Sequence, residues 1–155
     1  MKESLVLLSL FLLSSIVYAE EYPLLKSEAE YKSDAQEICM KEWTKRGELD
    51  YRMYEYCLEQ QMDGYIKLLN FHQYLSKDFY SKFAYPYCIK KWTKRGVVDT
   101  RMLAHCLEQE VEGFKDVIYY KEKYDKQAVG RIAKRALSMY GSWNMAAYSV
   151  KKAVD

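Results

Sequence analysis

The sequence has few residues that interrupt helices and little that predicts a sheet. Its 155 residues include only six glycines and two prolines. No stretch alternates apolar and polar residues for long enough to propose a strand. The chain instead contains sixteen tyrosines and three tryptophans. The composition therefore predicts an aromatic-rich, all-α protein.

The chain also lacks a strong charge of either sign and the usual marks of catalysis. Its 24 basic and 22 acidic residues give a formal net charge of +2, whereas a protein that binds nucleic acid usually has a stronger basic bias. Only two histidines, His72 and His105, are present to support a zinc site. No Ser-His-Asp order, phosphate-binding loop or metal motif stands out. We predict no nucleic-acid partner, no catalytic residue, no metal and no cofactor.

Residues 1–19 have the layout of a cleavable secretory signal. Lys2 precedes an apolar run from Leu5 to Val17, and the small residue Ala19 follows it. The run is too short for a comfortable membrane span, so we expect no stable membrane insertion after cleavage. Residues 20–155 are then expected to form a single all-helical domain that is periplasmic or secreted.

A long pattern occurs twice in the chain. CMKEWTKRGELDYRMYEYCLEQ begins at Cys39 and CIKKWTKRGVVDTRMLAHCLEQ begins at Cys88. Apolar residues on both sides of the TKRG segment recur at three- and four-residue spacing, which is typical of amphipathic helices. In the first copy, Gly47 suits the left-handed residue after a helix that ends at Arg46, and Asp50 suits the N-cap of the next helix. Each copy is therefore predicted to form a helical hairpin.

The cysteine spacing predicts one disulfide in each hairpin. Cys39 lies seven residues before Arg46 and Cys57 lies seven after Asp50, so the two cysteines lie at one height above the turn. Four cysteines allow three connectivities. In an oxidising compartment we favour bridges within each repeat, worth on the order of 3 kcal/mol apiece. The favoured pairs are Cys39–Cys57 and Cys88–Cys106.

A third, shorter stretch keeps the inner spacings of the pattern. In ALSMYGSWNMAAYSV, Ala136 and Ser149 replace the cysteines, and the turn is shorter. One interpretation is a third, degenerate hairpin, and the alternative is an unrelated amphipathic C-terminal helix. The first gives a row of hairpins near residues 34–80, 84–124 and 130–153, each burying a face on the next. One turn nearer to each loop, the predicted core pairs are Trp43 with Met53, Trp92 with Met102, and Tyr140 with Met145.

The repeated stretch resembles a motif of small exported proteins of proteobacteria. In CMKEWTKRGELDYRMYEYCLEQQ a cysteine and a tryptophan precede a turn with an aspartate, and then come Arg-Met, a second cysteine and a glutamine. The motif covers residues 39–61 and 88–110 and, more loosely, 136–152. The TKRG turn is longer than in the shorter forms of the motif, and the third copy has no cysteines. The resemblance implies an exported disulfide-bonded hairpin and implies no activity.

Charged residues are repeated along with the motif. The TKRG cations lie at predicted helix C-termini, where positive charge offsets the helix dipole. Alternatively, two adjacent turns form a basic rim for an anionic group of a glycan, a lipid head group or an acidic protein. These cations are Lys45, Arg46, Lys94 and Arg95. Other repeated residues are expected on helix surfaces, where they link neighbouring hairpins: Arg52 and Arg101, Glu59 and Glu108, Gln60 and Gln109.

These patterns favour a noncatalytic interaction or structural module of the bacterial cell envelope. Its expected partner is another envelope or secreted protein. The alternative is an envelope-acting hydrolase or a small-ligand-binding protein with a pocket between hairpins, for which Glu59 and Glu108 are the candidate carboxylate pair. A flat aromatic patch would favour the interaction module. A deep cleft that holds either glutamate would favour the alternative.

Overall fold

The computed structural model describes residues 25–155, so the predicted signal sequence lies outside the described residues. The predicted all-α fold is confirmed. Three helix pairs follow one another along the chain: α1 (Glu28–Trp43) with α2 (Tyr51–Tyr74), α4 (Tyr85–Trp92) with α5 (Thr100–Lys123), and α6 (Lys126–Tyr140) with α7 (Trp143–Val154). Short α3 (Lys77–Phe79) and the π-helix η1 (Tyr80–Ala84) join the first pair to the second.

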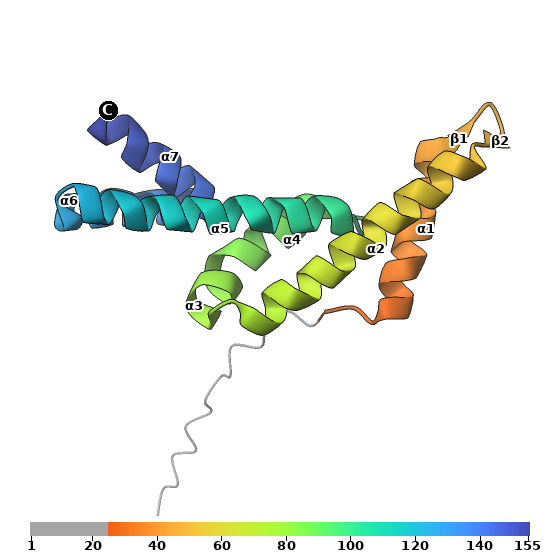
Figure 1. The fold of residues 1–155 in the computed structure, drawn as a ribbon, viewed down its shortest axis with the longest axis horizontal. Helices are drawn as coiled ribbons and strands as arrows, with labels where there is room; N and C mark the ends of the chain where they lie inside the picture. The colour runs from red at the N-terminus through yellow and green to blue at the C-terminus, as the bar shows by residue number, and fades with distance from the viewer. Residues whose placement is uncertain (1–24) are drawn as a thin grey trace, which may run out of the picture.

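The second helix of each pair packs against the second helix of the next pair. The α2 helix packs on α5, and α5 packs on α7. Figure 1 shows the result as an elongated row, with α1 and its ribbon at one end, α5 across the middle, and α6 and α7 at the other end. The chain is therefore a row of hairpins in which each helix pair buries a face on its neighbour.

The predicted disulfide pairing is confirmed. Cys39 bonds to Cys57 and Cys88 bonds to Cys106, with a Cα–Cα distance of 5.7 Å in each pair. All four residues are buried, so each bridge clamps its hairpin from within the core.

The third stretch also forms a hairpin rather than a single C-terminal helix. The α6 helix ends at Tyr140, Gly141 adopts a left-handed φ of 65°, and Ser142 caps α7. In place of a disulfide, the core of this hairpin contains small apolar residues: Val129, Ala133, Ala136, Ala146, Ala147 and Val150.

The first helices of the two long repeats end earlier than predicted. The α1 helix ends at Trp43, and the prediction that it runs to Arg46 is wrong. Two short antiparallel ribbons follow the helices: β1 (Thr44–Lys45) with β2 (Glu48–Leu49), and β3 (Thr93–Lys94) with β4 (Val97–Val98). At both ribbon tips arginine and glycine have positive φ, 54° and 86° in the first and 54° and 82° in the second. Two positive φ values in a two-residue loop are typical of a type I′ hairpin turn.

The predicted N-cap at Asp50 is confirmed, and the second helices of the other two hairpins are capped in the same way. The side chains of Asp50, Asp99 and Ser142 accept hydrogen bonds from the backbone N–H three residues later, at 3.2, 3.0 and 3.2 Å. Each ribbon is closed at its base by a bond from the aspartate N–H to a tryptophan carbonyl, 3.1 Å to Trp43 and 3.0 Å to Trp92. These bonds hold the two helices of a hairpin in register, so the cysteines meet although the first helix is shorter than expected.

The predicted core pairs are only partly buried. Trp43, Trp92 and the methionines at 53, 102 and 145 are half-buried. Tyr140 is 46% exposed, and its predicted place in the core is wrong. In the first hairpin the ribbon extends beyond the tryptophan, and Lys45 Nζ lies 5.7 Å from the Trp43 ring centroid. The third hairpin has only Gly141 and Ser142 between its helices, so no ribbon covers the ring of Tyr140.

Candidate functional site

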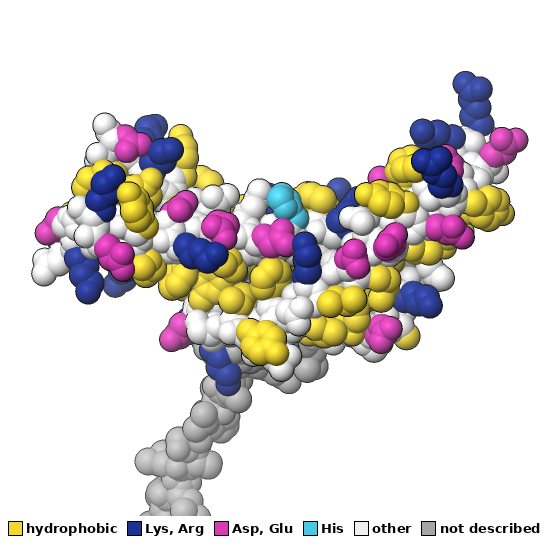
Figure 2. Space-filling model, viewed as in Figure 1, with side chains coloured by type: hydrophobic (Ala, Val, Ile, Leu, Met, Phe, Trp, Pro, Cys, Tyr) yellow, Lys and Arg dark blue, Asp and Glu magenta, His cyan; other side chains and the backbone are white. Residues whose placement is uncertain are grey.

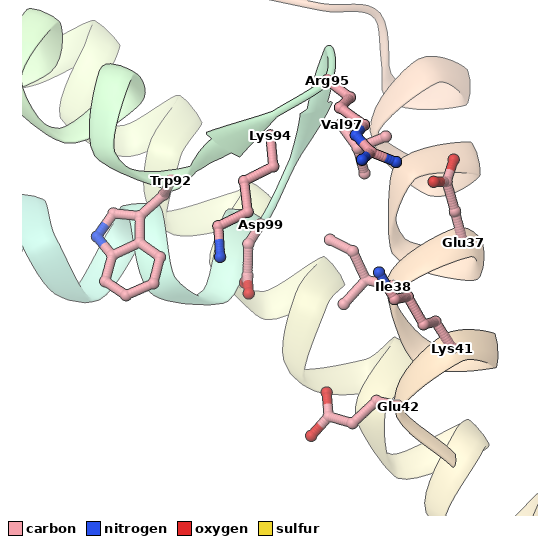
Figure 3. A pocket seen from close by; sticks show the side chains of 9 residues that line it. All are labelled: Glu37, Ile38, Lys41, Glu42, Trp92, Lys94, Arg95, Val97 and Asp99. Carbon is pink, nitrogen blue, oxygen red and sulfur yellow. The ribbon is translucent and has the colours of Figure 1, made fainter. Parts of the chain in front are cut away.

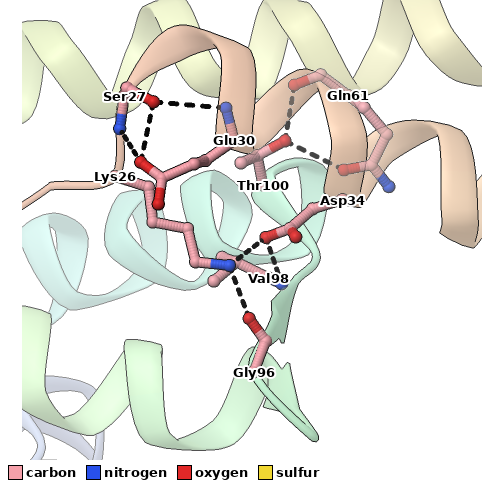
Figure 4. A network of polar contacts seen from close by, with 8 residues as sticks. All are labelled: Lys26, Ser27, Glu30, Asp34, Gln61, Gly96, Val98 and Thr100. Atoms are coloured by element: carbon pink, nitrogen blue, oxygen red, sulfur yellow. Dashed lines mark hydrogen bonds and ion pairs between the residues drawn. The ribbon is translucent and has the colours of Figure 1, made fainter.

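A buried glutamine joins the first hairpin to the second. Gln61, in the middle of α2, is fully buried at the start of α5. Its Nε2 donates to Asp99 Oδ1 at 2.9 Å, and its Oε1 accepts from Thr100 Oγ1 at 2.9 Å. Thr100 Oγ1 also lies 2.6 Å from the Gln61 carbonyl oxygen, and Figure 4 shows both contacts between these residues. The glutamine therefore binds the N-cap and first residue of the next hairpin's second helix.

A buried glutamate joins the second hairpin to the third in the same way. Glu110 of α5 is 1% exposed, and its two carboxylate oxygens accept from Ser142 Oγ and Trp143 N, both at 2.6 Å. Burial raises the pKa of the Glu110 carboxyl, and these hydrogen bonds oppose the shift. Glu110 is the repeat equivalent of Gln61, so both junctions use one device.

A glycine lets the helices approach closely at each junction. A Cβ atom added to Gly64 would lie 2.5 Å from the Thr100 carbonyl oxygen, and one added to Gly113 would lie 2.5 Å from Asn144 Cα and N. Real Cβ atoms do not approach backbone that closely, so any side chain would push the hairpins apart. The junction signature is therefore Gln or Glu, two residues, then Gly.

This signature was missed at the sequence level. The linking role was predicted instead for the two residues before it, because these are identical between the copies: Glu59 and Glu108, and Gln60 and Gln109. The residues of the signature itself, Gln61 and Glu110, differ between the copies. Part of the linking prediction does hold. Lys67 pairs with Glu108 across the first junction at 2.7 Å, and Glu42 pairs with Arg101 at 3.5 Å. Gln109 instead contacts His105 on its own helix.

A second polar network holds α1 against the ribbon of the next hairpin. Asp34, which is nearly buried, accepts from Val98 N at 2.9 Å and from the Lys26 ammonium. Lys26 also donates to the carbonyl of Gly96 at the ribbon tip. Figure 4 shows the contacts of Lys26 and Val98 meeting at the Asp34 carboxylate, and the contact of Lys26 with the Gly96 carbonyl beside them. The backbone N–H of Val98 in β4 is thereby bound by the Asp34 side chain of α1.

A cleft of about 630 Å³ lies beside this network. Residues of α1 form one wall, and the second ribbon with its flanking residues forms the other, as Figure 3 shows. Asp34–Val98 contacts hold the two walls together at one end, and the Glu42–Arg101 pair does so at the other. The lining residues are Glu37, Ile38, Lys41, Glu42, Trp92, Lys94, Arg95, Val97 and Asp99.

The charges of the cleft are unequally engaged. Glu42 pairs with Arg101, and Asp99 Oδ1 accepts from Gln61 and from Met102 N. By contrast, the cations that line the cleft form no ion pair with another described residue. These cations are Lys41, Lys94 and Arg95.

The four predicted basic residues are not at helix C-termini. Lys45 and Lys94 lie in strands, and Arg46 and Arg95 occupy the ribbon tips, so the helix-dipole interpretation of their positions is wrong. The second pair lines the cleft and the first does not. Figure 1 places the β1–β2 ribbon at the far end of the molecule, beyond α1 and α2.

A smaller hollow of about 290 Å³ lies over the first junction. Glu108 and His105 are among its lining residues, and Glu59 is not. The Glu108 carboxylate is occupied by Lys67 at 2.7 Å, with His105 Nδ1 3.7 Å away. The structure therefore does not bring the proposed carboxylate pair together in either hollow.

Several tyrosines lie open on the surface. Tyr51 and Tyr74 are 73% and 75% exposed, and Tyr56, Tyr119 and Tyr148 are also more than half exposed. Figure 2 shows hydrophobic side chains gathered below the middle of α5 and along the lower side of α2, with charged side chains between them. The exposed aromatics are spread over several helices rather than joined in one flat patch.

Within residues 25–155, no cluster of histidine, cysteine and acidic side chains is arranged to hold a metal ion. None of the helices in this range combines the length and the apolar character needed to cross a bilayer. Comparison with protein-family models, with curated proteins and with solved structures found no match for the chain.

Proposed function

We propose that the protein is an exported, noncatalytic interaction module of a bacterial cell envelope, and that its basic ribbons bind an acidic partner protein. The observation that carries this proposal is the unequal pairing in the cleft. Among the described residues, Lys94 and Arg95 of the second ribbon have no ion-pair partner. Of the acidic residues that line the cleft with them, Glu42 and Asp99 are engaged within the protein and Glu37 is not. Carboxylates of an acidic partner would form ion pairs with these two cations.

Export is supported by the cysteines and by the predicted signal sequence. All four cysteines are buried in disulfides, which form and persist in oxidising compartments. The resemblance to a motif of small exported proteobacterial proteins supports the same location. The periplasm and the secreted space are both oxidising enough for such bridges.

The free ends of the hairpin row are poorly suited to binding another hairpin. Ala104 and Ala147 occupy equivalent buried positions at the two junctions. On the first hairpin this position is Glu55, which is exposed. On α7 the residue equivalent to Gln61 and Glu110 is Ala153, which has no side chain to cap a further helix. Polar or altered residues at the ends are typical of capping repeats, so we place the partner on the side of the row.

The hydrolase alternative has less support. Glu108 lies in the smaller hollow but is paired with Lys67, and Glu59 lines neither hollow. A glycosidase needs two carboxyl groups that flank one bond. Small-ligand binding, the other part of this alternative, has more support than hydrolysis, because the larger cleft does lie between two hairpins.

The test is capture of partner proteins from the native envelope by the full chain. We expect the wild-type protein to retain an acidic protein in a salt-sensitive way, and the variant K45E/R46E/K94E/R95E to lose it. The melting temperature should stay nearly unchanged, because these four cations are exposed and form no ion pair with a described residue. Equal capture by the folded quadruple variant, detected by mass spectrometry, would reject the proposal.

A further inference from the structure

We infer that the cleft between α1 and the second ribbon binds a short, extended peptide segment that carries carboxylate groups next to an apolar side chain. This inference rests on the proposed function and specifies which part of the partner is recognised. It also distinguishes the two basic ribbons, which the sequence alone cannot do, because their TKRG segments are identical.

The cleft is preformed and has the size of a ligand site. Its volume of about 630 Å³ falls within the range of clefts that bind small molecules or a few residues of a peptide. Its two walls belong to different hairpins, each clamped by a disulfide. Asp34 joins α1 to the ribbon through Val98, and Glu42 pairs with Arg101 of the second hairpin, so these contacts position the two walls when no ligand is present.

The chemistry of the lining requires both charge and apolar surface in the ligand. Lys41 approaches from α1, and Lys94 and Arg95 from the ribbon, so carboxylates can be held from two sides. Between these cations lie the half-buried side chains of Ile38 and Val97, which Figure 3 shows on opposite walls. An apolar side chain of the ligand would bury surface against them.

The acidic residues of the lining favour a peptide over a polyphosphate. Glu37, Glu42 and Asp99 also face the cleft and would repel a ligand with dense negative charge. Glu37 has no ion-pair partner among the described residues and can accept a hydrogen bond from a peptide N–H. A peptide offers all three groups that the lining can bind. Its carboxylates would pair with the cations, its apolar side chain would pack on Ile38 and Val97, and its backbone N–H would donate to Glu37.

The first ribbon supplies a matched control within the same molecule. Lys45 and Arg46 lie in the same TKRG segment as Lys94 and Arg95, with the same strand register and matching positive φ values at the tip. They lie outside both hollows. If the cleft is the binding site, the second pair matters and the first does not. If bulk positive charge is enough, both pairs matter equally.

The experiment measures binding of a short fluorescein-labelled peptide of alternating glutamate and leucine to the full chain by fluorescence anisotropy. We expect K94E/R95E to weaken binding by about tenfold or more, and K45E/R46E to change it by less than about twofold. Peptides in which serine replaces leucine, or glutamine replaces glutamate, should bind more weakly. Pyrophosphate should compete poorly. Circular dichroism verifies that both double variants remain folded.

The other outcomes overturn the inference in distinguishable ways. Absence of binding to the wild-type protein, or equal loss in both double variants, would reject the cleft as the site. Strong competition by pyrophosphate would reject the peptide as the ligand class. In each of these cases the envelope-capture experiment still decides whether an acidic partner exists at all. Loss of capture in the quadruple variant would then retain the proposed function without this cleft.

Discussion

Gln61 and Glu110 occupy the same position in consecutive hairpins, and each is buried against the first turn of the next hairpin's second helix. The amide of Gln61 matches an N-cap aspartate, because Nε2 donates to Asp99. The carboxylate of Glu110 matches an N-cap serine, because Ser142 Oγ donates to it. The residue that joins two hairpins is thus paired with the capping residue it meets.

This pairing predicts that exchanging the two residues has unequal effects. Gln61→Glu removes the donor to Asp99 and places two carboxyl groups in contact, so the free energy of unfolding should fall by about 1 to 3 kcal/mol. Glu110→Gln can still accept from Trp143 N and donate to Ser142 Oγ, so it should change the free energy by less than about 1 kcal/mol at neutral pH. Urea denaturation of both variants measures the difference. Equal destabilisation would show that the capping residues do not determine whether glutamine or glutamate is favoured at this position.

The same glutamate should make stability depend on pH. Burial raises the pKa of Glu110 in the folded chain. A raised folded pKa stabilises the fold below the pKa of the unfolded chain, and this contribution is lost as the pH rises through the folded pKa. As the pH rises from about 4 through the folded pKa of Glu110, the free energy of unfolding of the wild type should therefore fall relative to that of E110Q. Urea denaturation at several pH values measures this difference. A difference in the free energy of unfolding that does not change with pH would contradict the role of Glu110.

The junction glycines should not tolerate even a methyl group. Gly64→Ala and Gly113→Ala each place a Cβ 2.5 Å from backbone atoms of the next hairpin, so each should cost about 1 to 3 kcal/mol or more. Gly130→Ala is the control, because its Cβ would meet nothing nearer than Lys121 Cε at 3.9 Å. Within a helix that change should stabilise the protein by up to about 1 kcal/mol. Thermal unfolding of the three variants checks this order.

The third hairpin should accept the disulfide that its equivalents contain. Ala136 precedes the last residue of α6 by one turn, as Cys88 does in α4, and Ser149 follows its N-cap by the same number of residues as Cys106. Changing both residues to cysteine should give a bridged protein, detectable by non-reducing peptide mapping. Two free thiols in the folded variant would show that the register of this hairpin differs from the other two.

Local signals were enough to predict the helical hairpins, the aspartate N-caps and the cysteine pairs. Asp50 and Asp99 were recognisable because capping chemistry needs only neighbouring residues. The ribbons were not recognised for two reasons. Gly47 can have a positive φ either after a helix or in a type I′ turn, and the first turn residue, Arg46, is an arginine where asparagine is the usual signal. The prediction placed Gly47 after the end of a helix rather than in a hairpin turn.

The junctions and the cleft required the three-dimensional structure. The roles of Gln61 and Glu110 depend on residues more than thirty positions away. Their difference in identity also hid their equivalence, although the glycine three residues later is kept in both copies. The cleft likewise depends on how the second ribbon lies against α1, so identical TKRG segments have different surroundings.

The most direct test of the account is site-specific photo-crosslinking in the living envelope. A photoreactive residue at Val97 would lie in the cleft, and one at the equivalent strand position, Glu48, would lie outside it. We predict that Val97 crosslinks to one segment of an envelope protein that is rich in aspartate or glutamate, that Glu48 does not, and that K94E/R95E abolishes the product. Crosslinking of the same products from both positions, or of a segment without acidic residues, would contradict the account.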